Sequence, residues 1–175
     1  MGTIGNTADT LLLSLELVGT EEVESVDDPV TTLAEVTVRH LDASGSARLL
    51  GHEDVDLFTF LPAPSAEGLQ VLNRRNMKWI RLSAPRGTIV LNSGDYMQRI
   101  SNDIFPSTTH RVGKPRDVAQ RRTPRVSFPM AVYVWEDEML EVLPCIAGAK
   151  YPPVRAIEFH TAITSKFYGD GYAVK

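Results

Sequence analysis

A histidine and an aspartate lie two residues apart in the segment "RLLGHEDVDLFTF". Its β-branched and aromatic residues predict a strand, in which residues i and i+2 point to the same face. His52 and Asp54 would then direct an imidazole and a carboxylate at the same volume, while Glu53 points away. An imidazole and a carboxylate are both ligands that divalent metals accept. The segment therefore predicts two ligands of a metal site.

A third ligand would have to come from elsewhere, and the remaining histidines are His40, His110 and His160. His110 ends "IFPSTTH", a strand-like segment 58 residues after His52, and in a β sandwich such a segment can return beside the first strand. Two histidines and one carboxylate form the facial triad of non-haem iron(II) oxygenases. The alternative is an ordinary half-buried histidine held by hydrogen bonds, because His-x-Asp also occurs by chance.

The segment "PRVSFPMAVYV" places Arg125 and Ser127 on one face of a later predicted strand. A planar guanidinium can bind a carboxylate through two hydrogen bonds, and a serine hydroxyl two residues away can add a third. An iron enzyme that consumes a 2-oxo acid needs such an anchor at some distance from the metal. The alternative for Arg125 is a surface cation on an edge strand.

Length and composition exclude several classes of protein. The 175 residues suit a single domain, and a net charge of −4 does not favour nucleic-acid binding. The single cysteine, Cys145, excludes an internal disulfide and a multi-cysteine zinc site. The longest apolar cluster, "TLLLSLELVG", is interrupted by Ser14 and Glu16, so it predicts neither a membrane span nor a signal peptide. We expect a cytoplasmic protein.

Over most of the chain the sequence predicts short strands separated by turns. Apolar residues at helical spacing predict a helix near residues 11–18, which Gly19 would end, and a C-terminal helix after Pro153 and before Gly169. A short helix is expected within "DYMQRISND". Strands are expected at 33–41, 49–61, 69–72, 78–82, 88–91, 107–112, 125–135 and 139–143. Strands at this spacing predict an all-β sandwich, jelly roll or barrel.

Four blocks in the same order, "GHEDVDLFTFL", "EGLQVLNRRNMKWIRLSAPRGTIVLNSGDYMQRISND", "PSTTHRVGKP" and "PRVSFPM", resemble the isopenicillin N synthase-like family of Fe(II)/2-oxoglutarate-dependent dioxygenases. The resemblance implies a mainly β fold, a double-stranded β-helix (jelly roll) core at 33–143 with an N-terminal and a C-terminal helix. The tail at 150–175 resembles the C-terminal extension of bacterial members. By this resemblance 1–175 is a single domain without the family's N-terminal half.

The resemblance also implies roles for individual residues. His52, Asp54 and His110 would bind the iron, and Arg125 and Ser127 would hold the distal carboxylate of 2-oxoglutarate. In the segment "NSGDYMQ", Gly94 would form the tight turn before the short helix and Asp95 would cap that helix.

The expected activity is hydroxylation, desaturation or cyclisation of a small molecule with Fe(II) as cofactor and 2-oxoglutarate as cosubstrate. One alternative is an oxidase of the same fold that uses no 2-oxoglutarate, with Arg125 and Ser127 binding the substrate. Another is a truncated, non-catalytic jelly-roll domain that needs a partner. A dimer or a partner chain would cover the surface where the N-terminal half packs in the family.

Overall fold

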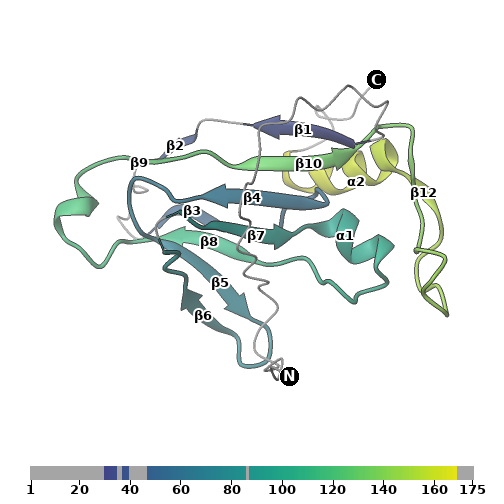
Figure 1. The fold of residues 1–175 in the computed structure, drawn as a ribbon, viewed down its shortest axis with the longest axis horizontal. Helices are drawn as coiled ribbons and strands as arrows, with labels where there is room; N and C mark the ends of the chain where they lie inside the picture. The colour runs from purple at the N-terminus through teal and green to yellow at the C-terminus, as the bar shows by residue number, and fades with distance from the viewer. Residues whose placement is uncertain (1–29, 35–36, 40–46, 86, 169–175) are drawn as a thin grey trace.

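Two four-stranded antiparallel sheets face each other in the described part of the chain (Figure 1). The structure, a computed structural model, describes residues 30–34, 37–39, 47–85 and 87–168. The first sheet has the order β1-β10-β4-β7, with β1 Val30–Ala34, β10 Met130–Val134, β4 Phe58–Pro62 and β7 Ile89–Ser93. The second has the order β3-β8-β5-β6, with β3 Ala47–His52, β8 His110–Gly113, β5 Leu69–Asn73 and β6 Lys78–Arg81.

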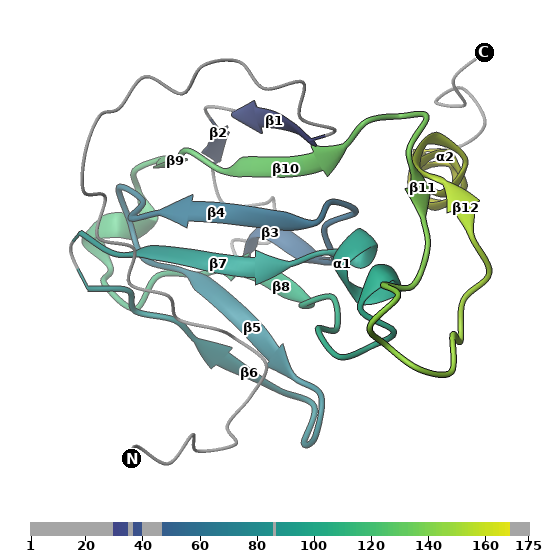
Figure 2. The same cartoon turned by 45° about the vertical axis from the view of Figure 1, so that its right-hand side comes forward.

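Two further strand pairs and three helical segments complete the described part of the fold. β2 (Thr37–Arg39) pairs with β9 (Arg125–Ser127), and β11 (Met139–Leu140) pairs with β12 (Val154–Arg155). The helical segments are α1 (Asp95–Ile100), the 3-10 turn η1 (Ala119–Arg121) and α2 (Ala156–Tyr168). Figure 2 shows α1 and α2 at one end of the sandwich and β9 at the other. This arrangement is the predicted jelly roll, so the expected fold class is confirmed.

Strand register determines which side chains point between the two sheets. In the first sheet Thr59 pairs with Asn92, and in the second Val71 pairs with His110. All four side chains are buried. Because side chains alternate along a strand, the residues two positions further on each strand point to the same interior.

A small core lies behind α1 and fixes the end of the sandwich where α1 and α2 lie. It contains Leu57, Tyr96, Leu140 and Ala156, which are at most 8% exposed. Tyr96 belongs to α1 and Ala156 begins α2, so the core joins both helices to the loop before β4. Burial of these apolar groups stabilises that loop.

Both helices expected in the described residues are present. The C-terminal helix begins after Pro153 and ends before Gly169, as predicted, and the short helix forms at the start of "DYMQRISND". The helix expected at 11–18 lies outside the described residues. No helix in the described ranges is long and apolar enough to cross a membrane.

Two predicted strands are interrupted. The run at 49–61 divides into β3 and β4, because the carbonyls of Asp54 and Asp56 between them accept hydrogen bonds from the start of α1. The run at 125–135 divides into β9 and β10 at Pro129, whose ring nitrogen cannot donate a ladder hydrogen bond. The predicted strand at 107–112 begins only at His110.

Candidate metal centre

Three side chains converge at the end of the sandwich next to α1. His52 ends β3, Asp54 lies in the following loop, and His110 begins β8, the strand that pairs with β3. One nitrogen or oxygen atom of each residue lies within 4.8 Å of those of the other two. His52 and His110 are register partners, and their ring centroids are 4.3 Å apart. The fold therefore brings together the three residues that the sequence suggested as metal ligands.

Backbone carbonyls orient both imidazoles. Nδ1 of His52 lies 2.9 Å from the Leu50 carbonyl oxygen, and Nδ1 of His110 lies 3.0 Å from the Thr108 carbonyl oxygen. A carbonyl oxygen only accepts, so in the neutral rings we assign the proton to Nδ1. In these tautomers the lone pair is on Nε2, and Nε2 of His52 and of His110 lies 3.5 Å and 3.9 Å, respectively, from a carboxylate oxygen of Asp54.

Asp54 does not lie on a strand, contrary to the prediction that His52 and Asp54 share a strand face. It follows the end of β3, and its carboxylate is held by side chains from the first sheet. The Thr59 hydroxyl lies 2.6 Å from Asp54 Oδ2, and the Asn92 amide nitrogen donates to the same oxygen at 2.9 Å. Tertiary hydrogen bonds, and not strand alternation, thus direct this carboxylate toward the histidines.

The electrostatics of the cluster favour an anionic carboxylate at Asp54 and a neutral ring at His110. Burial alone would raise the pKa of Asp54, but His52, the charge of His110 and hydrogen bonds from Thr59 and Asn92 hold it well below its usual range. Burial lowers the pKa of His110, although the Asp54 carboxylate opposes that effect. A carboxylate and two neutral imidazoles are the protonation states that a divalent metal requires.

A second buried carboxyl group, Asp56, lies directly behind the cluster. It is fully buried, and burial raises its pKa to about 7. The Thr59 hydroxyl lies 2.7 Å from Asp56 Oδ2 as well as close to Asp54. A hydroxyl has a single proton, so Thr59 can donate fully to only one of the two carboxylates. A protonated Asp56 would satisfy both contacts by donating to the Thr59 oxygen while Thr59 donates to Asp54.

The start of α1 fixes the loop that carries Asp54. The amides of Asp95 and Tyr96 donate to the carbonyls of Asp54 and Asp56, at 2.9 Å and 3.1 Å. Gly94 is the N-cap residue and makes no side-chain cap, so the expectation that Asp95 caps the helix is wrong. A Cβ at Gly94 would lie 2.3 Å from both the carbonyl oxygen and Oδ1 of Asp56. Glycine is required here by this close approach.

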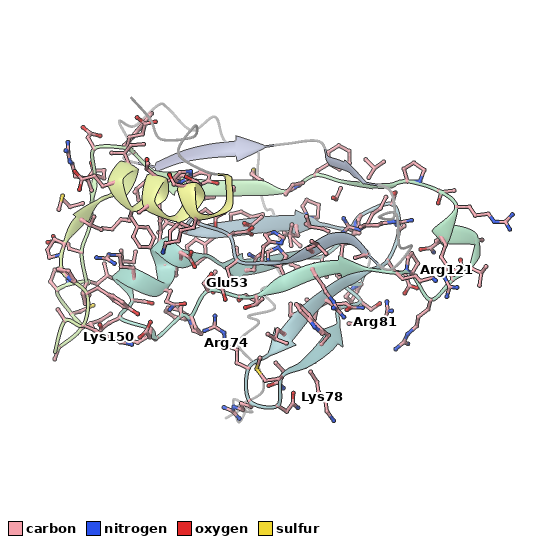
Figure 3. All side chains as sticks on the ribbon, turned by 180° about the vertical axis from the view of Figure 1, so that it is seen from behind. Glu53, Arg74, Lys78, Arg81, Arg121 and Lys150 are labelled. Atoms are coloured by element: carbon pink, nitrogen blue, oxygen red, sulfur yellow. The ribbon has the colours of Figure 1, made fainter. Side chains whose placement is uncertain are left out.

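Glu53 points away from the metal centre, as predicted, and ties the loop to the second sheet. Its Oε1 accepts hydrogen bonds from Arg74 and Thr109, both at 2.6 Å. Figure 3 shows Glu53 and Arg74 close together on the back of the molecule. The residue before Asp54 is therefore anchored, which restricts the carboxylate further.

The donor set fits a divalent iron ion. Two imidazole nitrogens and one carboxylate oxygen lie within 4.8 Å of one another, and in the tautomers argued above each imidazole carries its lone pair on Nε2. This ligand set keeps coordination positions of the metal open for small ligands. Of the other histidines, His40 lies outside the described residues. His160 is a packing residue as expected, 3.3 Å from the Tyr96 hydroxyl.

Arg125 and Ser127 lie together on β9, and both are buried. Arg125 Nη1 donates to the Ser127 hydroxyl oxygen at 2.9 Å, and its Nε donates to the Ala66 carbonyl at 3.2 Å. Burial lowers the pKa of Arg125 to about 10, and the positive charge of Arg48 contributes. A guanidinium with a pKa well above neutrality keeps its charge at physiological pH, so Arg125 is a buried cation.

A cavity of about 300 Å³ lies beside Arg125. Its wall includes Leu61 of β4, Leu69 of β5 and Val90 of β7, together with Gln120 of η1. The three metal-centre residues are not part of this wall. The cavity is largely apolar with one buried cation, which is a common composition for a small-molecule binding site.

The cavity lies one strand repeat away from the metal centre. Leu61, Leu69 and Val90 each lie two residues along a strand from a residue at the metal end, namely Thr59, Val71 and Asn92. Residues i and i+2 of a strand point to the same face and are about 6.7 Å apart along the strand. The wall of the cavity and the residues beside the metal centre thus lie on the same faces of these strands.

Sequence reasoning missed four residues that shape this region, Arg48, Asp56, Thr59 and Asn92, and it also missed the close contact that requires glycine at position 94. In the sequence, Thr59 and Asn92 look like ordinary polar residues of strands, and Arg48 looks like a cation at the end of a strand. The segment "NSGD" was recognised as a turn, but nothing local indicates that Gly94 contacts the Asp56 backbone. Only the pairing of β4 with β7 brings Thr59 and Asn92 to one carboxylate.

Comparison with known proteins points to a single family. Residues 37–131 match the sequence profile of the 2OG-Fe(II) oxygenase superfamily. The chain is 42% identical over 112 residues to the 2-oxoglutarate-Fe(II) type oxidoreductase ppzC of Metarhizium majus, covering 62% of this chain and 28% of that protein. It is 30% identical over 165 residues to the 2-oxoglutarate-Fe(II) type oxidoreductase hxnY of Emericella nidulans, covering 87% of this chain and 46% of that protein.

Solved structures agree with these sequence matches. The full-length T7H of Neurospora crassa, solved in complex with alpha-KG, is 28% identical with a TM-score of 0.64, and the match covers 70% of this chain and 38% of T7H. A Caulobacter crescentus protein assigned to the 2OG-Fe(II) oxygenase family is 29% identical with a TM-score of 0.67, covering 77% and 45% of the two chains. The chain thus spans less than half the length of each of these four proteins.

Proposed function

Because the chain belongs to the 2OG-Fe(II) oxygenase superfamily, we propose that it carries the catalytic centre of an Fe(II)- and 2-oxoglutarate-dependent oxygenase acting on a small molecule. The observation that carries this proposal is that a possible metal site and a cavity lie close together between the two sheets. A two-histidine, one-carboxylate cluster lies at one end, and a cavity with a buried guanidinium lies one strand repeat away. The reaction would be a hydroxylation, a desaturation or a cyclisation.

In this proposal His52, Asp54 and His110 hold Fe(II). When bound, Fe(II) supplies the chemistry in which dioxygen and 2-oxoglutarate give succinate, carbon dioxide and an oxidised substrate. The chain's own contribution is to keep the three ligand atoms in place. The Leu50 and Thr108 carbonyls fix the imidazoles, and comparable contacts in other metal sites are worth 10- to 100-fold in metal affinity or activity.

Arg125 and Ser127 would bind the distal carboxylate of 2-oxoglutarate. The Ser127 hydroxyl oxygen accepts from Arg125 Nη1, which leaves its own proton to donate to a ligand. Burial strengthens a charge-assisted hydrogen bond because the local dielectric constant is low. The largely apolar wall at Leu61, Leu69 and Val90 would exclude water from the carbon chain of the cosubstrate.

Anaerobic titration of the purified protein with Fe(II) and 2-oxoglutarate tests this proposal. A visible metal-to-ligand charge-transfer band is expected when both are present, and it should be absent in His110→Ala. The matched control is His160→Ala, which removes a histidine from α2, outside the cluster, and should keep the band. A band that survives in His110→Ala, or that fails to form in the unmodified protein, would contradict the proposed function. Succinate formation under oxygen gives an independent measurement.

The proposal also covers a binding partner and the cellular location of the protein. Leu50 and Phe128 are 73% and 52% exposed, and a second copy or a partner chain would cover such apolar surface. Size-exclusion chromatography with light scattering would detect a dimer. We also propose a cytoplasmic location, where Fe(II) and 2-oxoglutarate are both supplied, and cell fractionation would test it.

A further inference from the structure

Arg48 is a second buried cation at the end of the sandwich where Arg125 lies. It belongs to β3 and is 5% exposed, compared with 6% for Arg125. Its Nη2 donates to the carbonyl oxygens of Gln120 and Thr123, at 2.5 Å and 2.6 Å. Gln120 lines the cavity, and Thr123 lies two residues before Arg125. Arg48 therefore lies behind the part of the cavity wall that Gln120 and Arg125 form.

The charge of Arg48 is poorly compensated by the residues that the structure describes. Its Nε and Nη1 are buried and have no hydrogen-bond partner in the described part of the chain. Among the described residues, no carboxylate forms an ion pair with Arg48 or with Arg125. Burial lowers the pKa of Arg48, and its charge in turn lowers the pKa of Arg125. Two like charges buried without a counter-charge are costly, and an anionic ligand would remove that cost.

The acidic residue of the cavity wall does not provide the missing counter-charge. Glu67 is exposed, and its Oε1 accepts hydrogen bonds from the backbone amides of Arg116 and Asp117. Its carboxylate is thus directed to the loop that precedes η1. The buried side of the cavity remains positively charged.

We propose that Arg48 and Arg125 together make the cavity selective for ligands with a distal carboxylate. This inference rests on the proposed function, since the expected ligand is a 2-oxo acid that reaches from the metal centre into the cavity. Arg48 acts as a positioning residue: it supplies a second positive charge behind the wall and holds η1 against it. A 2-oxo acid that ends in a methyl group would gain nothing from that charge.

Binding measurements on matched ligands and variants test this inference. The ligands are 2-oxoglutarate and 2-oxopentanoate, which has the same carbon chain but a methyl group in place of the distal carboxylate. Both are titrated anaerobically into the Fe(II)-loaded protein. Arg48→Met keeps the length of the side chain and removes the charge, Arg48→Lys restores the charge, and Arg122→Met removes an exposed cation from the neighbouring loop as a control.

Arg48→Met should weaken 2-oxoglutarate binding by about tenfold or more, as expected for the loss of a nearby charge in a partly buried site. Binding of 2-oxopentanoate should change by less than about threefold, because that ligand has no distal charge. Arg48→Lys should recover most of the affinity for 2-oxoglutarate, and Arg122→Met should resemble the unmodified protein. If Arg48→Met folds poorly, the same comparison is made with Arg48→Gln, which removes the charge and keeps an amide that can donate toward the Gln120 and Thr123 carbonyls.

An equal effect of Arg48→Met on both ligands would overturn the inference, because Arg48 would then only support η1. No effect on either ligand would also overturn it. A measurement on metal-free protein separates this inference from the proposed function: glutarate should raise the Tm of the unmodified protein and not of Arg48→Met. If glutarate does so while the charge-transfer band is absent, the proposed function fails and the inference stands. If glutarate leaves both Tm values unchanged, the inference fails.

Discussion

Replacing Gly94 with alanine should destabilise the protein and disturb its metal centre together. The backbone at Gly94 is extended, with φ −105° and ψ −173°, so alanine can adopt it without strain. The obstacle is steric, because the new Cβ would lie 2.3 Å from the Asp56 carbonyl oxygen and 2.8 Å from the Asp54 carbonyl oxygen. Restoring ordinary contact distances requires the loop to move by roughly 1 Å.

The size of the effect follows from what that movement disturbs. It weakens the hydrogen bonds from the Asp95 and Tyr96 amides to the loop carbonyls, each worth about 1 kcal/mol. Residual crowding adds about 2 kcal/mol, which gives a total near 4 kcal/mol on the scale of these contributions. For a domain of this size the Tm should fall by roughly 10 °C. Because Asp54 moves with the loop, Fe(II) affinity should fall by about tenfold or more.

Gly148→Ala provides the matched control. Gly148 has φ +72° and no atom within 4 Å of a Cβ, so alanine there costs only the left-handed backbone penalty of about 1 kcal/mol. Thermal melting by circular dichroism and Fe(II) titration of both variants give the comparison. The reasoning is refuted if Gly94→Ala melts within a few degrees of the unmodified protein and binds Fe(II) equally well, or if Gly148→Ala costs more than Gly94→Ala.

Three further predictions follow from side-chain contacts. Asn92→Ala removes the amide that donates to Asp54 Oδ2, so Fe(II) affinity in a metal titration should fall by about tenfold; unchanged affinity would contradict the assigned orientation. Arg125→Lys keeps the charge and loses the planar fork of donors, so calorimetry should show 2-oxoglutarate binding weakened by about tenfold with Fe(II) affinity nearly unchanged; weaker Fe(II) binding instead would show that the anchor is misplaced. Burial lowers the pKa of His160, so the unfolded chain takes up a proton first as the pH falls, and stability present above the unfolded pKa of about 6.5 is lost below it. Metal-free His160→Gln should therefore lose less Tm between pH 7.5 and pH 5 than the unmodified protein, and identical losses would count against this role.

The sequence alone determined the residue types of the site and most of the strands. An imidazole, a carboxylate and a guanidinium have the same chemistry in any fold, so His52, Asp54 and Arg125 could be recognised before their positions were known. Alternation of apolar residues has the period of a strand, which predicted β5, β6 and β7 closely. The C-terminal helix followed from its apolar spacing between a proline and a glycine.

Tertiary structure alone decided how the site is held together. Asp54 was expected on a strand, but its carboxylate is positioned by Thr59 and Asn92, which come from two strands of the opposite sheet. The close approach of Gly94 to Asp56, and the burial of Arg48 behind the cavity, likewise join segments far apart in the chain. Such contacts depend on strand register and on the packing of loops against one another. Local propensity carries no information about either, since the energy that selects them comes from residues distant in sequence.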